Sequence, residues 1–143
     1  MIGIGNEFRR DDGVGLAVAK EIASRNLPDV QVMTAIGEPT TILDAWSGVP
    51  LAIAVDAAMG DGATPGRIRR WTPGDAAESG VVSSHALGLP QTYGLGEALG
   101  QKPDKLVVVT VEIADAGHGV GLTPAVAAAV PAVVEAIVSE LNR

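Results

Sequence analysis

The sequence has no cysteine, few aromatic side chains and an excess of acidic over basic residues. Without cysteine, disulfides, thiolate metal sites and a cysteine nucleophile are excluded. Aromatic residues make up 3% of the chain against 47% for all hydrophobic residues, so a core must be built from Ala, Val, Leu and Ile. Seventeen acidic and ten basic residues give a formal net charge of −7, which disfavours nucleic acid and anionic membranes as partners.

Several catalytic and membrane signatures are missing too. The chain has no His-Glu-x-x-His helix, no Gly-x-Ser-x-Gly elbow and no Walker A lysine motif. Gly3-x-Gly5 opens like a dinucleotide-binding loop, but Phe8 replaces the third glycine, so nucleotide binding ranks third among the functions considered. The apolar runs look too short or interrupted to span a bilayer, and no signal peptide precedes them, which predicts a cytoplasmic protein.

The order of predicted elements indicates one α/β domain over residues 1–143. We expect strands at 1–4, 30–35, 51–55, 67–72 and 105–113, and helices at 12–26, 40–46, 87–99 and 124–141. This alternation predicts a three-layer α/β/α sandwich around a mostly parallel sheet. The link 56–66 is too short for a parallel crossover, so strand 67–72 is predicted to be an antiparallel edge strand, paired with strand 51–55 as a hairpin.

Three polar residues lie at or near the expected carboxyl ends of strands. Asp12 follows the first strand, Asp56 comes directly after the apolar run 51–55, and His85 stands at the entrance to the third helix. Ligands of open α/β sheets bind at this edge, so we expect the three side chains to meet there. Two carboxylates and an imidazole suit a borderline divalent ion such as nickel or zinc.

Each of these residues also has a purely structural interpretation. Asp12 can cap the first helix, Asp56 can simply end a strand, and His85 can be an ordinary surface histidine. A triad of Ser83 or Ser84 with His85 and Asp56 ranks low, because neighbours in sequence seldom face each other productively. Asp11, beside Asp12, is expected to be solvated.

Four separated motifs resemble those of the [NiFe]-hydrogenase maturation proteases. The motifs are Gly3-Ile4-Gly5-Asn6 with Asp11-Asp12-Gly13-x-Gly15, Val55-Asp56-Ala57, Ser84-His85-x-Leu87-Gly88-Leu89, and Gly121-Leu122-Thr123-Pro124. The resemblance implies a five-stranded mixed sheet of the phosphorylase/hydrolase-like type, with the fourth strand antiparallel at an edge beyond the fifth. It also implies an endopeptidase that removes the C-terminal extension of a hydrogenase large-subunit precursor after nickel insertion.

By the same resemblance, Asp12, Asp56 and His85 are both the catalytic residues and the contacts to nickel. The nickel is carried by the precursor, so we expect no cofactor of the protein's own. Asn6, Gly37 and Glu38 are expected to border the substrate, and backbone amides at Gly5-Asn6 or at the start of the first helix to stabilise an oxyanion.

The chain departs from the family pattern at three places. Only Met1 and Ile2 precede the first glycine, Asp12 replaces the longer Glu of some relatives, and Ile36-Gly37-Glu38-Pro39 replaces a common Asp-Gly-Gly-Thr. The first strand is therefore expected to be short.

Two functions remain open at this point. The first is a peptidase of aspartic or metal-assisted type, expected to be monomeric, with the large-subunit precursor as partner. The alternative is a non-hydrolytic chaperone or checkpoint that senses nickel in a metalloenzyme client. The acid-acid-His set favours the peptidase, since binding alone does not demand it.

Overall fold

The computed structural model describes residues 1–60, 62–73, 82–83 and 88–142. In chain order the elements are β1 (Ile2–Ile4), the 3-10 helix η1 (Arg10–Gly13), α1 (Val14–Ser24), β2 (Met33–Ala35), α2 (Pro39–Trp46), β3 (Leu51–Met59), β4 (Ile68–Trp71), β5 (Val82–Ser83), α3 (Leu89–Leu99), β6 (Lys105–Glu112) and α4 (Pro124–Leu141).

The sheet follows the order β2-β1-β3-β6-β4, with the two-residue β5 paired to the end of β3. The pairs β1–β2, β1–β3 and β3–β6 are parallel, whereas β4 runs antiparallel to β6 at the edge. The predicted sandwich with a mostly parallel sheet and one antiparallel edge strand is therefore confirmed, and β5 is a short addition to it.

The predicted hairpin of β3 with the fourth strand is wrong. β3 is an inner strand, paired with β1 on one side and with β6 from Leu51 to Ala58 on the other. Pairing two long apolar strands buries more surface than pairing β3 with the charged segment around Arg69 and Arg70. β4 consequently lies beyond β6, as the family resemblance implied.

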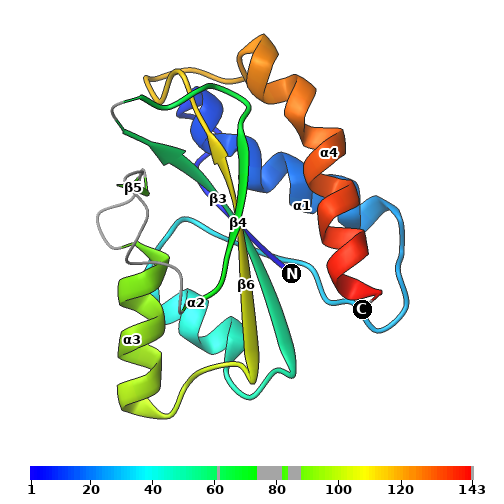
Figure 1. The fold of residues 1–143 in the computed structure, drawn as a ribbon, viewed down its shortest axis with the longest axis vertical. Helices are drawn as coiled ribbons and strands as arrows, with labels where there is room; N and C mark the ends of the chain where they lie inside the picture. The colour runs from blue at the N-terminus through cyan, green and yellow to red at the C-terminus, as the bar shows by residue number, and fades with distance from the viewer. Residues whose placement is uncertain (61, 74–81, 84–87, 143) are drawn as a thin grey trace.

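Two helical layers cover the sheet, and alternate residues of β3 and β6 point to opposite layers. Ile53, Val55, Val107 and Val109 face α1 and α4, and the residues between them face α2 and α3. Figure 1 shows α1 and α4 together on one side of the strands, with α2 and α3 on the other. The core is almost entirely aliphatic, and the exception is Trp46, whose fully buried ring donates from Nε1 to the carbonyl of Gln101 at 3.0 Å.

Helix α4 corrects the expectation about membrane spans. Over its 18 residues the mean hydropathy is 1.6, so by length and composition alone it could cross a membrane. In the structure it packs along α1 and against the sheet, with Val126, Val133, Val134 and Ile137 buried. Its apolar character is that of a core helix of the sandwich.

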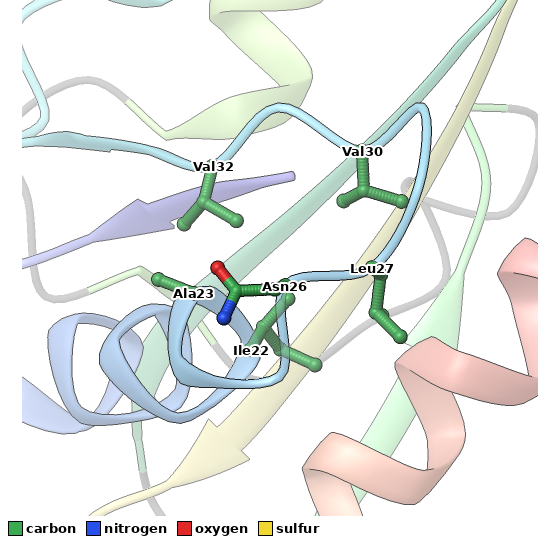
Figure 2. Close-up of a pocket in the computed structure, with 6 residues that line it drawn as sticks. All are labelled: Ile22, Ala23, Asn26, Leu27, Val30 and Val32. Atoms are coloured by element: carbon green, nitrogen blue, oxygen red, sulfur yellow. The ribbon is translucent and has the colours of Figure 1, made fainter.

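A cavity of about 320 Å³ lies at the C-terminal end of α1, lined by Ile22, Ala23, Asn26, Leu27, Val30 and Val32. Figure 2 shows these side chains around the turn that leads from α1 toward β2. Because α1 runs back from the carboxyl end of β1, this cavity is at the opposite end of the sheet from Asp12. It is therefore distinct from the predicted site.

Candidate active site at the carboxyl edge of β1 and β3

The point where the strand order reverses lies between β1 and β3. From β1 the chain passes through α1 to β2 on one side, and it returns through α2 to β3 on the other side of β1. In open α/β sheets, the crevice at such a reversal is where ligands bind. Asp12 follows β1 and Asp56 belongs to β3, so two of the three predicted site residues flank this point.

Close backbone packing brings η1 and α1 onto the ends of these strands. A Cβ at Gly15 would lie 2.4 Å from the carbonyl oxygen of Ile4 and 2.6 Å from that of Val55. Gly5, with φ of +152°, leaves no room for a Cβ beside the carbonyl oxygen of Asp12. The glycines of the first motif therefore let the segment that carries Asp12 approach β1 and β3 directly.

Asp12 is fully buried, and its Oδ2 accepts the backbone N–H of Asn6 at 3.0 Å. The residue at the N-cap of α1 is Gly13, so the interpretation of Asp12 as a helix cap is wrong. Asn6 is held in turn by its own Oδ1, which accepts the N–H of Phe8 at 2.9 Å. Asp12 is thus a buried carboxylate fixed against the turn that leaves β1.

Asp56 lies within β3, and the expectation that it ends the strand is wrong. β3 continues through Ala57 and Ala58, which pair with Val111 and Glu112 of β6. The Asp56 side chain is 3% exposed and belongs to the set of β3 residues that face α2 and α3. An ionisable group at a buried position of an inner strand needs polar or charged partners, and the functional role of Asp56 stays a prediction.

The third predicted residue, His85, lies outside the described residues, as does Ser84. Within the described ranges, no group of three His, Asp or Glu side chains is arranged to hold a metal ion. Asp12 and Asp56 share one edge, since η1 contacts β3. The role of His85 stays a prediction.

The remaining predicted residues border the same edge of the sheet. Gly37 follows β2 with φ of +93°, and exposed Glu38 precedes α2, where its carboxylate accepts the hydroxyl of Thr40 at 3.0 Å. Since β2 neighbours β1, both residues lie beside the Asn6 turn, and their contact with substrate stays a prediction.

The backbone amides expected to stabilise an oxyanion already have acceptors. The N–H of Gly5 donates to the carbonyl of Ala35 at 2.9 Å, and that of Asn6 donates to Asp12. At η1, the amides of Asp11 and Asp12 donate to the carbonyls of Asp115 and Arg9. These four amides are therefore not open donors in this conformation, and the oxyanion role of amides at the start of α1 stays a prediction.

Asp11 is the residue whose role was missed in the sequence. It is fully buried, and its carboxylate accepts the N–H groups of Ala114, Asp115 and Thr123 at 2.6–3.1 Å. The hydroxyl of Thr123 also donates to it, at 2.8 Å to Oδ2. Thr123 precedes α4, so Asp11 joins η1 to the β6–α4 loop and to the start of the last helix.

Further contacts join the same two segments, called here the first loop (residues 6–12) and the last loop (residues 114–123). The N–H of Arg10 donates to the carbonyl of Gly119, and the N–H of Gly119 donates to the carbonyl of Phe8. The guanidinium of Arg9 reaches the carbonyl of Ala116 at 3.1 Å. The first loop is thus held by the last loop as well as by hydrogen bonds within its own residues.

Comparison with known proteins agrees with the family resemblance of the sequence motifs. A family model described as hydrogenase maturation protease (HycI) matches residues 17–140. The chain belongs to the hydrogenase maturation protease family. That family is one of peptidases, and the match runs from α1 to α4, so it includes Asp56 and begins after Asp12.

Solved structures of hydrogenase maturation proteases share this fold. The endopeptidase HybD from Escherichia coli aligns with a TM-score of 0.80 and 25% identity, over 99% of this chain and 90% of its own. HybD from Thermococcus kodakarensis aligns with a TM-score of 0.78 and 24% identity, over 99% of this chain and 97% of its own. Among curated proteins no match was found.

Proposed function

We propose that this protein is the endopeptidase that removes the C-terminal extension of a [NiFe]-hydrogenase large-subunit precursor once nickel is in place. The observation that carries the proposal is the pair of buried carboxylates, Asp12 and Asp56, at the sheet reversal of a chain in the maturation protease family. The nickel belongs to the substrate in this proposal, and the protein brings no cofactor of its own. We further propose that it acts in the cytoplasm, as a monomer.

In the proposed mechanism, Asp12, Asp56 and His85 engage the precursor's nickel and so place the scissile peptide beside the Asn6 turn. One carboxylate, of aspartic-protease type, or the metal itself activates the attacking water. Asp12 suits a precise contact because its carboxylate is buried and its Oδ2 is already fixed on the Asn6 amide. The orientation is set before substrate arrives, so little ordering is lost on binding.

The test compares nickel-loaded with nickel-free precursor, with the products weighed by mass spectrometry. We expect one cut in the loaded precursor and none in the nickel-free form. Asp56→Asn should abolish cleavage while the circular dichroism spectrum stays native, because the substitution keeps the shape of the side chain. Asp115→Asn is the matched control, since Asp115 is a half-exposed carboxylate of the last loop.

Two results would overturn the proposal. Full cleavage by Asp56→Asn would show that the Asp56 carboxylate is not needed for the reaction. Tight binding of the loaded precursor by the wild-type protein without any cut would instead support the nickel-sensing checkpoint.

A further inference from the structure

A row of three polar residues crosses the sheet beside the candidate site. Asp56 of β3 pairs with Thr110 of β6, and Thr110 pairs with Arg69 of β4. Residues directly opposite each other on paired strands point to the same face of a sheet. Asp56, Thr110 and Arg69 therefore share the face covered by α2 and α3.

The middle of this row is partly exposed. Thr110 is half-buried although β6 is an inner strand, whereas the residues on either side of it, Val109 and Val111, are buried against the other helical layer. On the same face, Val108 is fully buried under α2 and α3. Among the residues of β6 on this face, Thr110 is the one that is partly exposed, since Leu106, Val108 and Glu112 are buried. The row of Asp56, Thr110 and Arg69 is called here the strip, with Thr110 as its floor.

Arg69 lies at the far end of this strip and is anchored there. Its Nε donates to Oε2 of Glu112 at 3.2 Å, and Glu112 is fully buried. Arg67 shares the same carboxylate at 3.5 Å, and Oε1 accepts the N–H of Thr64 at 3.1 Å. Two arginines on one glutamate leave this group with a net charge of +1, from two positive charges and one negative.

The outer part of the Arg69 guanidinium is available for a ligand. The Arg69 side chain is 39% exposed, and within the described part of the chain its one hydrogen-bonding partner is Glu112. The fork geometry of arginine keeps the two terminal amino groups pointing away when Nε is engaged. Four N–H donors thus remain on a group whose position is already set.

We infer that Arg69 is a substrate-binding residue of the proposed protease, holding backbone carbonyl oxygens of the precursor segment that lies over Thr110. This inference rests on the proposed function and adds a contact to the same site. A carbonyl suits the position better than a carboxylate, since Asp12 and Asp56 at this edge repel a second anion. Charge-assisted hydrogen bonds to neutral acceptors give both affinity and register along the segment.

The test measures cleavage of nickel-loaded precursor by Arg69→Met, with Arg70→Met as the matched control. Arg70 is on the same strand and also pairs with a buried glutamate, Glu140, but it points to the α4 face. We expect Arg69→Met to raise KM roughly 10- to 100-fold with kcat changed by less than about threefold, the loss of one or two charge-assisted bonds. Arg70→Met should leave KM unchanged, and Arg69→Lys should recover part of the loss.

A second variant probes the strip without altering charge. Thr110→Leu fills the floor with a larger side chain and should raise KM in the same way. If Arg69→Met and Arg70→Met have equal KM values on a precursor that the wild-type protein cleaves, the inference about Arg69 is wrong while the proposed function stands. If the wild-type protein cuts no precursor, the affinity of each variant for the nickel-loaded precursor is measured instead. Weaker binding by Arg69→Met, but not by Arg70→Met, would then support the Arg69 contact although the proposed protease function is wrong. Equal binding by the two variants would overturn both.

Discussion

The fully buried Asp11 carboxylate offers a direct test of how the site is held. Replacing Asp11 with Ala removes the acceptor for three backbone N–H groups, those of Ala114, Asp115 and Thr123, and for the hydroxyl of Thr123. A buried donor left without an acceptor costs about 1–3 kcal/mol, less where water can enter. Because several donors lose a charged acceptor and water can satisfy only some of them, we expect Asp11→Ala to cost about 3–5 kcal/mol.

Asp11→Asn separates the charge from the shape of the side chain. The amide keeps one acceptor oxygen, but its NH₂ group then faces backbone donors in place of the second oxygen. We expect about 2–3 kcal/mol of destabilisation, which for a chain of this size lowers Tm by roughly 10 °C. Guanidinium unfolding followed by circular dichroism gives the free energy, and a thermal scan gives Tm.

Asp115→Asn serves as the control, because its half-exposed carboxylate accepts one backbone N–H, that of Gly117, and otherwise pairs with half-exposed Arg10 at 3.5 Å. It should cost less than about 1 kcal/mol. Asp11→Asn should also lower cleavage of precursor under conditions where the variant is fully folded, since the first loop loses its support. Stability of Asp11→Asn equal to that of the control would refute the idea that Asp11 joins the two loops.

Three shorter predictions follow from the packing. Gly15→Ala should unfold the site or the protein, because its Cβ would meet two carbonyl oxygens at 2.4 and 2.6 Å; a native Tm would contradict the close packing of α1 on β1 and β3. Ile137→Ala should cost about 2–5 kcal/mol in guanidinium unfolding, since this side chain of α4 is fully buried in the core. Trp46→Phe should lose the hydrogen bond to Gln101 and cost about 1–3 kcal/mol, with unchanged cleavage of precursor, because Trp46 is at the end of α2 opposite Glu38.

The layers of the fold follow from local patterns in the sequence, whereas the position of β4 does not. Apolar runs such as 105–113 and the proline-initiated helix at Pro124 are visible in the sequence because burial and helix geometry dictate them locally. The position of β4 depends on whether β4 or β6 pairs with the free edge of β3. That competition is decided by total buried surface, which no local pattern records.

The site shows the same division. Asp12 and Asp56 were predictable because a carboxylate beside a glycine turn or inside an apolar run is unusual, and the family resemblance supported them. Asp11 was not, because its partners lie more than 100 positions away, at Ala114, Asp115 and Thr123. In sequence it looks like any acidic residue before a helix, and its burial becomes visible once the two loops are seen together.

The dependence of the first loop on the last loop has a consequence for the order of events during synthesis. The segment that carries Asp12 is synthesised before the groups that fix it, because Ala114 to Thr123 lie about 100 residues further along the chain. Chains grow far more slowly than local structure forms, so the nascent domain spends seconds with its first loop unsupported. A ribosome-bound chain that ends before residue 114 should therefore lack the hydrogen bonds that join the first loop to the rest of the domain.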